Sequence, residues 1–120
     1  MKNHNFRELI AWKESISLCA SVLEATKKLP DYEKFSLQSQ MNRSVISIPS
    51  NIAEGTSRNS VKDLSKFLDY SLGSCYELET QFIITQKVYP DVITSDHLNQ
   101  LYKIQNYIGA FKHKINSKNP

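Results

Sequence analysis

Apolar side chains recur every three or four positions along most of the chain, which is the spacing of one face of an α-helix. Four such segments, at about residues 7–29, 36–56, 60–89 and 95–115, are separated by short stretches that contain proline, glycine or helix-capping residues. The pattern predicts an all-α protein, an antiparallel up-and-down four-helix bundle. We expect one domain over residues 1–120, with frayed ends at about 1–5 and 116–120.

The polar residues between the segments predict where the helices begin and end. Gly55, near the end of the second segment, is expected to take the left-handed conformation that stops a helix. Ser60 and Asp63 resemble a capping box at the start of the third helix. Thr94 or Ser95 is expected to cap the fourth helix.

Pro49 interrupts the second segment within the stretch SIPSNIAEGTSR, residues 47–58. Proline has no backbone N–H, so the carbonyl of Val45 loses its helical partner and a kink is expected. Nearby serine hydroxyls can offset that loss. We therefore predict a second helix that is kinked at Pro49 rather than a loop.

The first and second helices have apolar arcs wider than the interior of one bundle requires. On the second helix, Ile46, Pro49 and Ala53 form an apolar sector beside the core sector. One interpretation is a monomer with exposed aliphatic side chains. The other, which the width of the arcs favours, is self-association through an apolar interface that includes these three residues.

The opposite side of the second helix carries a polar stripe: Arg43, Ser47, Asn51, Glu54 and Arg58, at spacings of four, four, three and four. Glu54 and Arg58 have the orientation that favours an ion pair within a helix. Such a stripe is either a solvated face or part of a structural network at a helix or subunit interface.

Glu79 lies inside the apolar arc of the third helix, where an unpaired carboxylate would be costly. Arg43, Asn51 and Arg58, from the same or a neighbouring subunit, are the candidate partners. We interpret Glu79 as a member of a structural polar network and not as a catalytic acid.

The net charge of +3 is unevenly distributed. Residues 97–120 contain four lysines and no acid, whereas residues 1–96 contain 11 basic and 12 acidic residues. Lys103, Lys112 and Lys114 are therefore candidates for nucleic-acid contact, although cations near a helix C-terminus also stabilise the helix itself. Cys19 and Cys75 fall at apolar helical positions, which indicates reduced core thiols and a cytoplasmic protein.

Patterns typical of catalytic or cofactor sites do not occur in the sequence. None of the three histidines has a glutamate three residues before it, and there is no glycine-rich phosphate loop or nucleophile elbow. We expect no metal, no cofactor, no small-molecule substrate and no enzymatic activity. No secretory leader or membrane span is expected. An enzyme whose site forms between subunits around Glu54 and Glu79 is a distant alternative.

Several segments together resemble a bacterial four-helix-bundle family that is often encoded in intervening sequences of large-subunit ribosomal RNA genes. These segments are FRELIAWK (6–13), LP (29–30), EKFSL (33–37) with Gln40, SIPSNIAEG (47–55) with Arg58, FL (67–68), GS (73–74) and ELE (77–79). Two positions depart from the family pattern: Ser36 replaces a more usual glycine, and Asn42 precedes Arg43 where two arginines are common.

The resemblance implies a ring-like homopentamer of four-helix bundles whose molecular function is largely unassigned. A more distant similarity is to the accessory variability determinant of diversity-generating retroelements, a pentamer that works with a reverse transcriptase and nucleic acid. We therefore expect a non-enzymatic homo-oligomer that binds RNA, DNA or a ribonucleoprotein partner. The alternative is a protein–protein scaffold without nucleic-acid contact.

Overall fold

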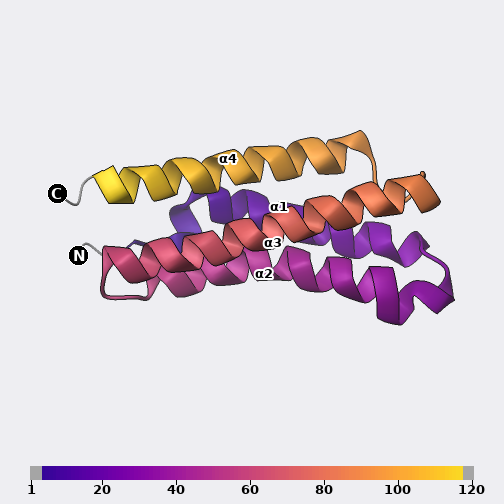
Figure 1. Ribbon diagram of the computed structural model, residues 1–120, viewed down its shortest axis with the longest axis horizontal. Helices are drawn as coiled ribbons and strands as arrows, with labels where there is room; N and C mark the ends of the chain where they lie inside the picture. Colours follow the sequence, from indigo (N-terminus) through magenta and orange to yellow (C-terminus); the bar gives the residue numbers. More distant parts are fainter. Residues whose placement is uncertain (1–3, 118–120) are drawn as a thin grey trace.

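The computed structural model describes residues 4–117, and these residues form four long α-helices and no β-strand. The helices are α1 (Ile10–Ala25), α2 (Ser39–Thr56), α3 (Val61–Val88) and α4 (Ser95–Ser117) (Figure 1). Shorter helical turns flank α1 and lead into α2: Phe6–Glu8, Thr26–Lys28, Asp31–Glu33 and the π-turn Lys34–Gln38. The predicted all-α class is confirmed.

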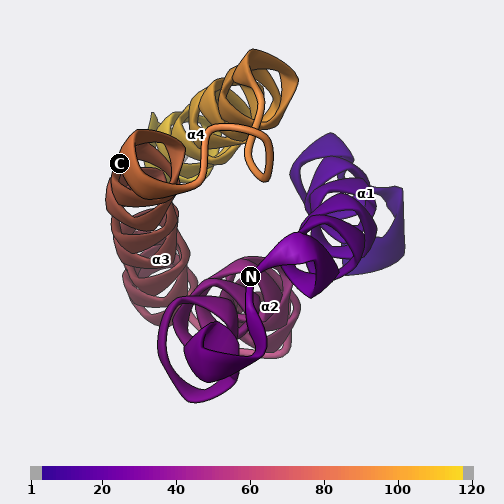
Figure 2. The same ribbon diagram turned by 90° about the vertical axis from the view of Figure 1, so that its right-hand side faces the viewer.

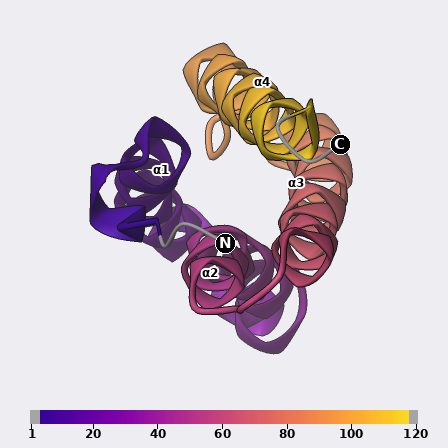
Figure 3. The same cartoon turned by 90° about the vertical axis from the view of Figure 1, so that its left-hand side faces the viewer.

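Each long helix packs against two others. Contacts join α1 to α2, α2 to α3, α3 to α4 and α4 back to α1, and the end-on views show the four helices around a common axis (Figures 2 and 3). The α2–α3 connection lies at one end of the long axis, and the other two connections lie at the opposite end (Figure 1). The described chain is elongated, with extents of 50 × 23 × 20 Å.

Large apolar side chains with no exposed surface fill the space between the four helices. They include Leu18 of α1, Ile48 of α2, Phe82 of α3 and Ile104 of α4. Each comes from the apolar stripe of its own segment, so the helical periodicity of the sequence directly marks the core. Burying one such side chain contributes about 1.5–3 kcal/mol.

The four predicted segments coincide with the four helices, although several boundaries differ. The backbone N–H of Asp63 donates to Ser60 Oγ at 3.1 Å, which confirms Ser60 as the cap of α3. Thr94 Oγ1 accepts from the N–H of His97 at 3.4 Å, so Thr94 rather than Ser95 caps α4. Residues 116 and 117, expected to be frayed, belong to α4, whereas residues 1–3 and 118–120 lie outside the described part.

The second helix begins later than predicted because the chain before it is distorted. Ser36 has φ −124° and ψ −106°, which are not helical values, and regular α-helix starts only at Ser39. The preceding turn is attached to the end of α3, where the Tyr89 hydroxyl donates to Glu33 at 2.7 Å. The pKa of Tyr89 is raised mainly by the hydrogen bond to Glu33 and next by the hydrogen bond to Tyr32.

Pro49 lies inside α2, which runs through it from Ser39 to Thr56. The Val45 carbonyl, which loses its partner because of the proline, accepts a hydrogen bond from the Cys19 thiol of α1 at 3.2 Å. The Ser50 hydroxyl donates to the Ile46 carbonyl at 2.8 Å. The carbonyl freed by the proline is therefore hydrogen-bonded to a thiol of the neighbouring helix α1 and not to a serine of α2.

Gly55 does not have the predicted role in ending α2. No glycine within residues 4–117 has a positive φ, and α2 continues through Gly55 to Thr56. Gly55 is buried instead at the contact between α2 and α3. A Cβ atom at this position would lie 2.9 Å from the Cβ of Phe67 and 3.0 Å from Cδ1 of Leu64, so the absence of a side chain allows the close approach.

Candidate functional site

Apolar side chains remain exposed along the outer boundary between α1 and α2. One face of α1 carries Trp12, Ile16, Cys19 and Leu23, at spacings of four, three and four. The hydrogen bond from the Cys19 thiol to the Val45 carbonyl shows that this face is turned toward α2. Ile16 is 42% exposed and Leu23 is 38% exposed. Trp12 is half-buried and packs against the core, whereas Ile16 and Leu23 leave much of their apolar surface in water.

Ile46 continues this apolar surface on α2. It is 47% exposed and lies one turn after Asn42, whose side-chain oxygen accepts from Thr26 at 3.0 Å. That contact shows which flank of α2 faces the end of α1. Of the other predicted interface residues, Ala53 is half-buried and Pro49 is buried within the single chain. We call Trp12, Ile16, Leu23, Ile46 and Ala53 the α1/α2 ridge.

The polar stripe of α2 lies on the other flank, beside α3. The hydroxyls of Ser47 and Ser74 are 2.6 Å apart and fix this orientation. Asn51 does not bridge helices, because its side chain donates to the Ser47 carbonyl one turn earlier at 2.9 Å. Glu54 and Arg58 form the predicted ion pair at 2.9 Å.

Arg43 lines a polar cavity of about 530 Å³ between α2 and α3 rather than joining the Glu54–Arg58 pair. The other lining side chains are Gln40, Ser44, Ser47, Ser74, Glu77 and Gln81. The Oε1 atom of Gln81 is buried and has no hydrogen-bond partner among the described residues. Sequence reasoning placed Glu77 away from the core but did not place it in the same cavity as Arg43, since that depends on the relative rotation of two helices.

Within one chain, Glu79 bonds to a partner that the sequence did not indicate. Its Oε1 accepts from the side-chain amide of Gln105 on α4 at 2.9 Å, and the side chain is half-buried. Glu79 therefore faces α4, whereas Arg43, Asn51 and Arg58 lie on α2. The predicted group of five polar residues is not a single network inside the described chain.

The three lysines proposed for nucleic-acid contact have different surroundings. Lys112 forms an ion pair with Asp69 of α3, which neutralises its charge locally. Lys114 borders an apolar cavity of about 200 Å³ between the start of α1 and the end of α4. Lys103 is exposed. Within one chain, Lys103, Lys112 and Lys114 therefore do not form a single basic site.

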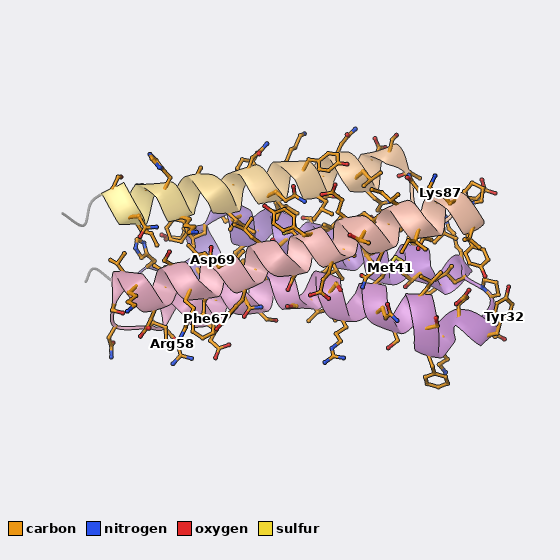
Figure 4. The ribbon with its side chains drawn as sticks, in the orientation of Figure 1. Tyr32, Met41, Arg58, Phe67, Asp69 and Lys87 are labelled. Carbon is orange, nitrogen blue, oxygen red and sulfur yellow. The ribbon has the colours of Figure 1, made fainter. Side chains whose placement is uncertain are left out.

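A basic and aromatic cluster that the sequence analysis missed lies at the corner where α2 ends and α3 begins. The Arg58 guanidinium lies 4.6 Å from the centroid of the Phe67 ring, and both side chains project from the same edge of the molecule (Figure 4). Lys66 lies 5.7 Å from the same ring. Tyr70 packs edge-on against Phe67 at 5.4 Å and is 51% exposed. The spacing of Lys62, Lys66 and Tyr70 along α3 was the available sequence signal.

Both cysteines are buried and free, as predicted. Burial raises the pKa of Cys19 to about 11. Burial, together with the nearby Glu79 carboxylate, raises the pKa of Cys75 to about 12. Thiols held in the protonated form are poor nucleophiles and poor metal ligands.

Between residues 4 and 117, no group of three or more histidine, cysteine, aspartate or glutamate side chains is arranged to hold a metal ion. None of the described helices combines the length and the apolar character needed to cross a membrane.

Comparisons with known proteins agree with this architecture. A solved structure of a protein of unknown function from the S23 ribosomal protein family of Bacteroides thetaiotaomicron superposes with a TM-score of 0.64 at 23% identity, covering 90% of this chain and 96% of that one. No curated protein is significantly similar to the chain. The sequence model of the family described as 23S rRNA-intervening sequence protein matches residues 7–112. The chain therefore belongs to the 23S rRNA-intervening sequence protein family.

Proposed function

We propose that this protein is a non-enzymatic homo-oligomeric module that assembles through the α1/α2 ridge. The observation that carries the proposal is the exposure of three aliphatic side chains on adjacent helices: Ile16 at 42%, Leu23 at 38% and Ile46 at 47%. Contiguous exposed apolar side chains mark interaction sites more often than isolated ones do. A second copy would remove them from water, at a gain of about 25 cal/mol per Å² of apolar surface buried.

The proposed subunit is an antiparallel up-and-down bundle, and the proposed assembly is a pentamer. The alternating positions of the three connections support the order of the helices (Figure 1). A kink at Pro49 would shape α2 beside Ile46, on the flank that carries the ridge. The pentameric number rests on family resemblance alone.

A nucleic-acid or ribonucleoprotein partner is the proposed target of the assembly. The family name associates these proteins with 23S ribosomal RNA genes, and the chain carries a net charge of +3. A protein–protein scaffold is the alternative, since the same ridge could bind another protein. Glu54 and Glu79 are each occupied by a side-chain partner, which favours a structural role over a catalytic one. We expect the assembly to be cytoplasmic, in keeping with its two free thiols.

The position of the interface can be tested with two matched charge insertions. Ile46→Glu places a carboxylate on the ridge, and Ile83→Glu places one on α3 at a similar exposure, 40% against 47%. We expect Ile46→Glu to dissociate the oligomer in gel filtration with light scattering, because a desolvated unpaired charge is costly. Ile83→Glu should leave the mass unchanged. Equal masses for wild type and Ile46→Glu would refute the ridge as the interface.

A further inference from the structure

The α2–α3 corner brings two cations, Arg58 and Lys66, close to the aromatic rings of Phe67 and Tyr70. Arg58 and Lys66 both lie near the Phe67 ring, at 4.6 and 5.7 Å from its centroid. Cation–π contacts of this kind fix the position of a charge without neutralising it. Because Arg58 is also ion-paired with Glu54, the uncompensated charge near the exposed Tyr70 is that of Lys66.

Two lysines of this corner are available to an external anion. No carboxylate of the described chain lies within 4.0 Å of the ammonium of Lys62 or Lys66, although both line a cavity of about 430 Å³ at the start of α3. They are four residues apart and occupy the same side of the helix. Two neighbouring free ammonium groups can contact successive phosphates of one strand.

The acids near these lysines are mostly engaged elsewhere. Glu54 is paired with Arg58, and Asp69 is paired with Lys112. Asp63 lies in the first turn of α3, where a negative charge is favourable to the helix itself. The local balance is four cations against three acids, counting Lys62 and Lys66, so the net charge is +1. Electrostatic attraction from one corner is therefore weak.

Besides cations for the phosphates, binding of a single strand needs an exposed ring on which an unpaired base can stack. Tyr70 is one turn beyond Lys66 on α3 and is 51% exposed. Its edge-on packing against Phe67, at 5.4 Å between centroids and 84° between planes, holds the ring in place. The Arg58 guanidinium, stacked on Phe67, is a second planar surface for a base. Bases of a duplex are already stacked and cannot use such surfaces.

We propose that the α2–α3 corner, made of Arg58, Lys62, Lys66, Phe67 and Tyr70, binds single-stranded nucleic acid. Lys62 and Lys66 contact phosphates, and an unpaired base stacks on Tyr70. This inference rests on the proposed oligomer, because repetition of a weak corner in each subunit multiplies its affinity for one long strand. The corner lies on the α3 flank of α2, opposite the ridge.

The test is fluorescence anisotropy with a labelled single-stranded RNA of about 20 nucleotides, long enough to reach more than one site. We expect Tyr70→Ala to weaken binding by about 5- to 140-fold, the range for loss of one stacked base. The matched control is Tyr76→Ala, which removes another exposed tyrosine of α3, 58% against 51%. Tyr76→Ala should bind as wild type does.

Lys66→Ala should weaken binding and flatten its salt dependence, since each phosphate contact contributes about 0.7 to the slope of log affinity against log salt for single strands. Lys87→Ala, which removes an exposed lysine from the last turn of α3, is its control and should leave the slope unchanged. A duplex of the same length should bind more weakly than the single strand. The proposal is overturned if wild type fails to bind at about 50 mM salt, if the duplex binds equally, or if Tyr70→Ala and Tyr76→Ala behave alike.

Two further measurements separate RNA binding from assembly and locate the bound RNA on the protein. Light scattering of every variant reports the oligomer separately, so weaker RNA binding by Tyr70→Ala at unchanged mass supports the corner. An intact wild-type oligomer that fails to bind RNA refutes the corner without refuting the assembly. Photo-crosslinking of wild-type protein to RNA containing 4-thiouridine needs no substitution at all. We expect crosslinked peptides to fall within residues 58–70, and crosslinks confined to α4 would overturn the assignment.

Discussion

Replacing Gly55 with alanine tests how closely α2 and α3 approach. The new Cβ atom would lie 2.9 Å from the Cβ of Phe67 and 3.0 Å from Leu64 Cδ1. The Phe67 Cβ is attached directly to the backbone, so it cannot move without shifting α3. Gly73 of α3 and Gly109 of α4 offer matched controls, because a Cβ at either position meets nothing within 4 Å.

Two opposing effects determine the magnitude. Replacing a glycine inside a helix with alanine stabilises by about 0.5–1 kcal/mol, which is the whole expected effect at Gly73 and Gly109. Overpacking a close contact costs about 1–3 kcal/mol. Gly55→Ala should therefore lower the free energy of unfolding by about 0–2.5 kcal/mol relative to wild type. Its free energy of unfolding should be about 1–3 kcal/mol lower than that of Gly73→Ala or Gly109→Ala.

Urea unfolding followed by circular dichroism, at one protein concentration for all variants, measures these differences. Thermal unfolding of the same variants should separate their Tm values by roughly 4 °C per kcal/mol. If Gly55→Ala is stabilised as much as Gly73→Ala, the close approach of α2 and α3 is wrong. If all three variants are destabilised, the helix-propensity part of the reasoning fails.

Two other predictions concern ionisable groups. His97 Nδ1 accepts from the Thr94 N–H at 3.0 Å, and its pKa is lowered by burial and by Lys28, with Asp96 opposing; stability present above about pH 6.5 should therefore be lost as the pH falls toward 5. His97→Asn should show a smaller loss of Tm over this range, and an identical loss would contradict the assignment. Cys19 and Cys75, with pKa values raised to about 11 and about 12, should react with Ellman's reagent at about pH 8 only after unfolding. Prompt reaction of either thiol in the folded protein would contradict its burial.

Sequence periodicity predicted the four helices and their core because a stripe repeating every three or four residues specifies one buried face per helix. Capping chemistry located the start of α3 at Ser60, since that interaction is local. Gly55 was misjudged for the opposite reason. Its role depends on Phe67 and Leu64, which belong to another helix, and glycine near a helix end ordinarily indicates a stop.

The candidate sites were predicted less completely than the fold. A helical wheel separated Ile46 from the polar stripe correctly, and it identified the Glu54–Arg58 pair because both residues lie on one helix. It could not show that Glu79 meets Gln105, because that contact depends on how α3 and α4 are rotated against each other. The Arg58–Phe67 contact at the α2–α3 corner was missed for the same reason.

The mass of the unmodified protein in solution shows whether the chain assembles. Light scattering across the micromolar range, at physiological salt, should give a multiple of the 13.8 kDa chain mass, and five copies for the proposed pentamer. A stable mass of another multiple would correct the number of copies and keep the assembly. A single species of 13.8 kDa at every concentration would contradict the proposed assembly.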